Sequence, residues 1–265
     1  MAETTTEPLD VVAVGPHPDD LEITCGGTLA LLVRQGYKVG IIDLTSGEPT
    51  PRGSPEVRVR EAEAARRVLG VQVRLNLGLP NRELMDVPAH RYALATALRR
   101  LRPAIVLATA GRTPAASPDH YQGQLLVEAA RFYSQLTKWD DRFADTPPYR
   151  VPHLVYAPFP FDAEVRQWHS TFVIDVTETF EQKLAAIRCY ESQFDAGRFE
   201  KVKHFVTGHC VALGSRCGFA YGEQFALPHP IGGSDLVSLV QGGKASAAPV
   251  NLAEASGSAG ASPSR

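Results

Sequence analysis

The segment His-Pro-Asp-Asp at residues 17–20 places one imidazole and two carboxylates within four positions. It follows the apolar run 11–14, which is typical of a short buried strand, and Gly15 and Pro16 indicate a turn directly after that strand. The three polar side chains are therefore expected at the carboxyl end of a strand. Open α/β sheets bind their ligands at this edge.

These residue types suit a metal ion. A tight turn can bring a ring nitrogen of His17 and a carboxylate oxygen of Asp20 onto one cation, and a catalytic zinc usually takes a third protein ligand. His120 is the best candidate, because it also follows a predicted strand, 104–108. Asp19 would then act as the base on metal-activated water.

A structural role explains the same residues without a metal. Asp19 and Asp20 could be helix-capping carboxylates, and His17 could be a hydrogen-bonded histidine of the turn. The residues alone leave both interpretations open.

The elements that must position these side chains alternate along the chain. The hydrophobic patterns predict helices that end at glycines or precede turn-rich loops, and short apolar strands between them. The expected helices are 26–36, 56–69, 89–101, 124–136, 177–194 and 199–213, and the expected strands are 11–14, 38–44, 71–77, 104–108, 153–157 and 172–174. This order predicts an α/β protein, a three-layer Rossmann-like fold with a mostly parallel sheet and helices on both faces.

Composition narrows the class of protein. The 265 residues, 44% of them hydrophobic, suffice for one domain, expected at 1–240, followed by a Gly/Ala/Ser-rich tail at 241–265 that we expect to be disordered. A net charge of −2 without a basic run disfavours nucleic acid as a partner. No apolar run approaches membrane-spanning length, and the polar residues 1–10 do not resemble a secretory signal, so we expect a cytoplasmic protein.

Other cofactor and nucleophile motifs are missing from the sequence. The first strand-to-helix turn is not GxGxxG, no P-loop is present, and no GxSxG elbow marks a serine hydrolase. The four cysteines have no CxxC spacing and are expected to be free, buried thiols.

A family resemblance extends this interpretation. The segment GPHPDDLEITCGGTLA resembles the signature of the LmbE-like (PIG-L) zinc-dependent N-deacetylases. The blocks DLTSGEPTPRGSPEVRVREAEAARRVLGV, NLGLPNREL, SPDH and YGEQF are similar to the bacillithiol-biosynthesis branch, whose members deacetylate N-acetylglucosaminyl malate. The resemblance covers residues 11–225.

The resemblance implies roles for particular residues. His17, Asp20 and His120 would bind zinc or another divalent metal, and Asp19 would be the general base. Arg58 would hold a carboxylate or hydroxyl of the substrate, although an exposed helix cation is an equal alternative.

Two further positions in the matching blocks could serve the site. Asp119 could orient His120 through its second ring nitrogen, or it could cap a helix. Tyr221 could reach the substrate, or it could pack in an aromatic core.

One position departs from the family pattern. Many relatives have a histidine three residues before the last ligand, where it stabilises the oxyanion or protonates the leaving amine, whereas this chain has Ser117. A serine can donate a hydrogen bond but cannot supply an imidazolium. Either Asp19 carries the proton both ways, or His229 or Arg112 substitutes, or the activity is weak.

The predicted function is hydrolysis of the acetamide of an N-acetylglucosamine-type sugar conjugate. One alternative is a metal-binding fold with weak or lost catalysis that binds a glycan or a protein, and another is an amidase acting on a thiol conjugate. Because the related bacillithiol-branch enzymes form hexamers, a homo-oligomer is expected. The expected partner is a small molecule, with no nucleic acid and no membrane.

Overall fold

The computed structural model describes residues 7–50, 52–160, 170–232 and 234. The chain divides into two units, Met1–Pro230 and Ile231–Arg265, and the elements described below belong to the first. The predicted tail 241–265 lies outside the described residues. Within the described ranges, no helix combines the length and apolarity needed to cross a membrane.

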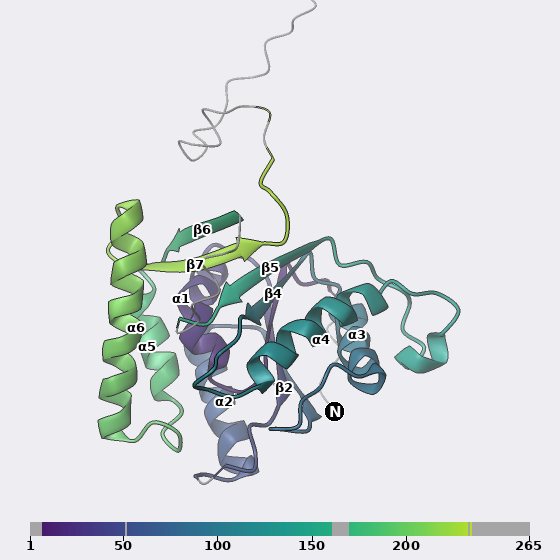
Figure 1. Ribbon diagram of the computed structural model, residues 1–265, viewed down its shortest axis with the longest axis horizontal. Coiled ribbons are helices and arrows are strands. Elements are labelled where there is room, and N and C mark those ends of the chain that lie inside the picture. The colour runs from purple at the N-terminus through teal and green to yellow at the C-terminus, as the bar shows by residue number, and fades with distance from the viewer. Residues whose placement is uncertain (1–6, 51, 161–169, 233, 235–265) are drawn as a thin grey trace, which may run out of the picture. The chain divides into compact units, whose positions relative to one another are not determined.

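A seven-stranded sheet forms the centre of the first unit, in the order β3-β2-β1-β4-β5-β7-β6 (Figure 1). Its strands are β1 (Val11–Gly15), β2 (Val39–Thr45), β3 (Val73–Leu79), β4 (Ile105–Ala110), β5 (His153–Pro158), β6 (Ser170–Asp175) and β7 (Gly222–Leu227). The first five strands pair in parallel, and β7 runs antiparallel to both β5 and β6. The predicted α/β fold with a mostly parallel sheet is confirmed.

Helices cover both faces of the sheet. They are α1 (Asp20–Arg34), α2 (Pro55–Leu69), α3 (Pro88–Leu101), α4 (Asp119–Tyr133), α5 (Phe180–Arg188) and α6 (Ala196–Cys217), with a short 3₁₀ helix η1 (Asp140–Phe143). Alternate residues of β1 separate the two cores: Val12 and Val14 pack with α3 and α4, whereas Val11 and Ala13 pack with α1, α2 and α5. A further apolar cluster joins α5 to α6.

The strand order reverses between β1 and β4. The chain proceeds from β1 outward to β2 and β3, then returns to β4 on the other side of β1, where Val14 pairs with Ala108. The segments that leave β1 and β4 must therefore separate at this edge of the sheet, which opens a crevice suited to a ligand. His17 follows β1, and His120 lies in the first turn of α4, which follows β4.

Two helices begin five or six residues earlier than the hydrophobic pattern predicts. Helix α1 begins at Asp20 instead of residue 26, with a break in its helical conformation at Cys25, and α4 begins at Asp119 instead of residue 124. In both cases the first turn carries polar side chains that point into the site, so apolar periodicity starts only later. His120 consequently lies on a helix and not in the loop before it.

The part of the chain after residue 176 differs more from the predicted elements. The single helix predicted at 177–194 is shorter, because α5 ends at Arg188 and a turn follows. Strand β7 was not predicted, because its sequence contains Gly222, Glu223 and Gln224 and does not alternate like an ordinary strand. The cysteines are free, but Cys217 is exposed, contrary to the expectation of buried thiols.

Candidate metal centre

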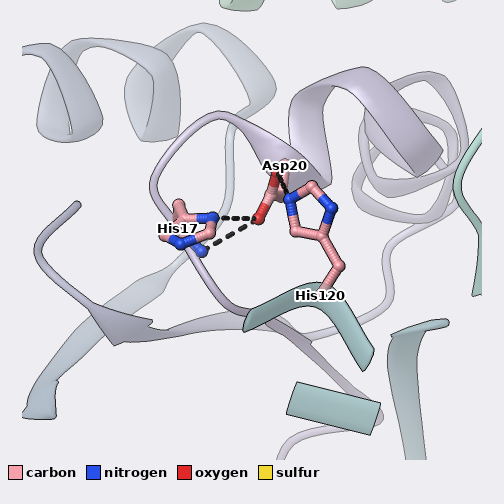
Figure 2. Close-up of side chains that lie close together, drawn as sticks. All are labelled: His17, Asp20 and His120. Atoms are coloured by element: carbon pink, nitrogen blue, oxygen red, sulfur yellow. Dashed lines mark hydrogen bonds and ion pairs between the residues drawn. The ribbon is translucent and has the colours of Figure 1, made fainter. Parts of the chain in front are cut away.

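Three side chains from two helix N-termini and one turn meet at the crevice between β1 and β4. His17, Asp20 and His120 each offer a donor atom, and these atoms all lie within 4.8 Å of one another (Figure 2). The Nδ1 atom of His17 lies 3.0 Å from Oδ2 of Asp20, and Nε2 of His120 lies 3.5 Å from Oδ1 of the same carboxylate. Asp20 thus stands between the two imidazoles.

The outward-facing ring nitrogens have hydrogen-bond partners of their own. Nε2 of His17 lies 3.2 Å from Oδ2 of Asp119, and Nδ1 of His120 lies 2.8 Å from Oγ1 of Thr113. The expectation that Asp119 orients His120 was therefore wrong. Consecutive residues of a helix point about 100° apart, so Asp119 reaches across to His17 while His120 turns toward Thr113.

This donor set fits a transition-metal ion. Two imidazoles and one carboxylate are the ligands of many catalytic zinc sites, and histidines that bind metal usually donate a hydrogen bond from their second ring N–H to a carboxylate or another oxygen. Burial disfavours the charged form of His17, but the carboxylates of Asp20 and Asp119 raise its pKa to about 10. Burial likewise opposes ionisation of Asp20, yet His120 and His17 hold its pKa well below the usual range. The pocket therefore favours positive charge at this point.

Asp19 occupies a strained position beside the cluster. It precedes α1 with φ of +108°, a conformation that is rare outside glycine and costs on the order of 1–3 kcal/mol. Arg58 holds the peptide in place: its Nη2 donates a hydrogen bond to the Pro18 carbonyl at 2.5 Å and lies 3.6 Å from Oδ2 of Asp19. Burial raises the pKa of Asp19 to about 7, against the attraction of the Arg58 guanidinium.

Arg58 is not an exposed helix cation. Its side chain is 3% exposed, and its Nε and Nη1 atoms are buried without a hydrogen-bond partner. Gly47, with φ of +74°, packs directly over the guanidinium, where a Cβ atom would approach Nη2 to 3.0 Å. The loop after β2 can therefore close over Arg58 only because residue 47 is a glycine.

A pocket of about 260 Å³ opens onto the cluster. It is lined by His17, Asp19, Asp20, Gly47, Thr50, Arg58, Asn81, Arg82, Ser117, His120 and Gln193. Ser117 thus lies in the pocket, where its Oγ accepts a hydrogen bond from the backbone N–H of Asp119 at 3.2 Å. Ser117 thereby provides a partner for the backbone N–H of the first residue of α4, which directly precedes His120.

The other predicted residues lie elsewhere. Tyr221 stacks on Phe180 with ring centroids 3.9 Å apart, in the cluster between α5 and α6, and it does not line the pocket. Arg112 and His229 are exposed and are also not among the residues that line it.

Several residues of the site carried no sequence signal. Thr113 lies in a loop rich in proline and glycine, Gln193 lies in a segment predicted as helix, and Phe159 stacks on His120 with centroids 4.0 Å apart. The backbone N–H of Arg82 donates a hydrogen bond to Oδ2 of Asp119 at 2.7 Å. Gln193, Phe159 and Arg82 reach the site from segments far apart in sequence from its ligands, and Thr113 meets His120, seven residues on, through the path of the loop before α4. Local patterns encode neither kind of contact.

Comparison with known proteins assigns this chain to a family. A family model described as PIG-L, GlcNAc-PI de-N-acetylase, matches residues 12–131, a segment that contains all three donor residues. The crystal structure of the conserved protein TT1542 from Thermus thermophilus is 36% identical, covers 85% of this chain and 97% of its own, and superposes with a TM-score of 0.74. The chain belongs to the PIG-L family.

Two curated relatives of this PIG-L protein carry different names. A diacetylchitobiose deacetylase of Thermococcus kodakarensis is 27% identical over 226 residues, 80% of each chain. A 4-oxalmesaconate hydratase of Pseudomonas putida is 29% identical over 198 residues, 69% of this chain and 73% of the relative. The named relatives therefore include both a deacetylase and a hydratase.

Proposed function

We propose that this PIG-L protein is a metal-dependent N-deacetylase that hydrolyses the acetamide of an N-acetylglucosamine-type sugar. The observation that carries the proposal is the His17–Asp20–His120 cluster with the Asp19 carboxylate beside it in one pocket. The name of the Thermococcus relative supports the same reaction type.

His17, Asp20 and His120 would hold the ion, which we take to be zinc or another divalent metal. When bound, it would supply a Lewis acid that activates water and stabilises negative charge on the amide oxygen. Asp19 would accept the proton of the attacking water at a carboxylate oxygen. Arg58 would keep that carboxylate aimed at the pocket through the Pro18 carbonyl.

The proton must then reach the leaving nitrogen. Hydrolysis adds the water's hydroxyl to the acyl carbon, breaks the C–N bond and releases acetate and an amine. Among the described residues that line the pocket, both histidines are assigned to the metal, and residue 117 is a serine. Asp19 is therefore the group that we assign to carry the proton from water to the amine.

The finer substrate is also a proposal. N-acetylglucosaminyl malate, expected from the resemblance to the bacillithiol branch, belongs in a substrate panel with diacetylchitobiose and N-acetylglucosamine. A homo-oligomer remains the expected assembly, and light scattering of the purified protein would test it.

The decisive experiment combines metal analysis with acetate release. We expect about one metal ion per chain, loss of turnover after chelation, and recovery when zinc is returned. His120→Ala should lose both the metal and the activity, whereas His204→Ala, at an exposed histidine of α6, should keep both. Full activity of His120→Ala would contradict the ligand assignment.

Hydration of an unsaturated acid is a second candidate, favoured by the 29% identity to the Pseudomonas hydratase. The same protein should be given such an acid, with loss of its ultraviolet absorbance as the assay. Hydration without acetate release from any sugar would replace the deacetylase proposal. Stoichiometric metal without either activity would favour the alternative of a metal-binding fold that has lost catalysis and binds a glycan or a protein.

A further inference from the structure

Helix α1, whose first turn carries Asp20, is broken inside the protein core. Cys25 has φ of −139° and ψ of +17°, so the turn Asp20–Thr24 is separated from the rest of the helix. A break of this kind frees backbone N–H and C=O groups that would otherwise pair within the helix. In a buried segment these groups need other partners.

Glu223 and Lys183 supply those partners from two other elements. The carboxylate of Glu223, in β7, accepts hydrogen bonds from the backbone N–H groups of Gly27 at 3.0 Å and Thr28 at 2.7 Å. The Nζ atom of Lys183, in α5, donates to the carbonyl of Ile23 at 2.8 Å. Glu223 therefore caps the second part of α1, as a carboxylate caps a helix N-terminus, while Lys183 holds the end of the first part.

The two side chains also bind each other. Lys183 Nζ lies 2.5 Å from Oε1 of Glu223, and each side chain is 1% exposed. A buried ion pair with such geometry fixes the separation of its two partners, because moving either one leaves a charge uncompensated. The angle between the two parts of α1 is consequently tied to β7 and α5.

The glycines of the Cys-Gly-Gly-Thr stretch make room for this pair. A Cβ atom at Gly27 would lie 2.9 Å from Val176 Cβ and 3.1 Å from Oε1 of Glu223. One at Gly26 would lie 3.3 Å from Lys183 Cγ. Larger side chains at these positions would push the pair away from the break.

We propose that Glu223 and Lys183 are positioning residues that set the first turn of α1, and with it the metal ligand Asp20 and the base Asp19. The expected effects on metal binding and kcat rest on the proposed function, whereas the expected effect on the conformation of residues 17–25 does not. It assigns a role to the glutamate of the YGEQF block, whose neighbour Tyr221 stays outside the pocket.

The test compares Glu223→Gln with a control of similar burial. Arg99 has a fully buried side chain that donates to the carbonyls of Ser134, Leu136 and Thr146 beyond the end of α4 opposite to His120. Arg99→Met should lower the melting temperature without affecting α1. All measurements are made below the melting temperature of each variant, with folding checked by circular dichroism.

Three readouts distinguish positioning from stability alone. For Glu223→Gln we expect roughly tenfold weaker zinc binding in competition with a chelator, a roughly tenfold lower kcat at similar KM, and faster hydrogen exchange in the peptide 17–25. Arg99→Met should match the wild type in all three. Lys183→Met should behave like Glu223→Gln.

Wild-type zinc affinity and unchanged exchange at 17–25 in a folded Glu223→Gln variant would overturn the inference. If Glu223→Gln does not fold, Glu223→Asp, which keeps the charge but shortens the reach to Gly27 and Thr28, carries the same comparison. If the wild type binds no metal, the proposed function fails, and the exchange of 17–25 still decides the positioning role.

Discussion

Replacing Arg58 by methionine tests how the strained Asp19 is held. The methionine fills much of the same space but donates no hydrogen bond to the Pro18 carbonyl, which Nη2 of Arg58 reaches at 2.5 Å. A hydrogen bond from a charged group is worth about 1.5–3 kcal/mol. If about 2 kcal/mol of that serves to orient Asp19 in the transition state, kcat/KM should fall roughly 30-fold.

The assay is acetate release from an N-acetylglucosaminide, with kcat and KM determined separately. Because Arg58 holds the base and not a ligand of the metal, we expect kcat to fall, KM to change little and the metal content to stay at the wild-type level. Arg60→Met, at an exposed arginine of the same helix, is the matched control and should lie within about twofold of wild type. A large rise in KM at constant kcat would instead show that Arg58 binds substrate, and an unchanged kcat/KM would refute both roles.

Three further predictions concern the second nitrogen of His17, the missing histidine and the buried Arg99. Asp119→Asn should weaken metal binding about 10–100-fold in a chelator competition, because Asp119 orients His17; unaltered affinity would contradict that role. Ser117→His should raise kcat at least about tenfold in the acetate assay, because the imidazole adds a proton donor to the pocket. A fall in kcat at full metal content would contradict the idea that proton transfer by Asp19 limits the rate. Arg99→Met should lower the free energy of unfolding in urea by about 3 kcal/mol, since three carbonyls lose a buried donor; a loss below about 1 kcal/mol would show that water replaces the guanidinium.

Much of the fold followed from local patterns. The apolar run of β1, the helix α2 with Ser54 accepting a hydrogen bond from Val57 N–H, and its left-handed end at Gly70 are all encoded by residues close in sequence. The limits of α1 and α4 were misjudged for one reason. Their first turns serve the site, so Asp20 and His120 replace the apolar residues that mark a helix.

Two of the metal ligands could be predicted from the sequence because they lie close together in it. His17 and Asp20 lie on one tight turn, so their meeting depends on local geometry. His120 comes from a distant segment and was predicted because it also follows a strand, and the family resemblance implied the same residue. The partner of Asp119 was a different case. Asp119 contacts His17 and not the adjacent His120, because the two side chains of α4 leave the helix in different directions relative to β1.

The sequence by itself thus determined the alternating α/β elements and the residue types that could bind a metal and move a proton. Only the tertiary structure decided how they are held: Arg58 on the strained peptide before Asp19, Asp119 and Thr113 behind the imidazoles, and the Glu223–Lys183 pair at the break in α1. The physical reason is that these contacts depend on the path of the chain in space: most join elements far apart in sequence, and Thr113 meets His120, seven residues on, only through the path of the loop before α4. Burial and direction, which a linear pattern does not contain, select the partner.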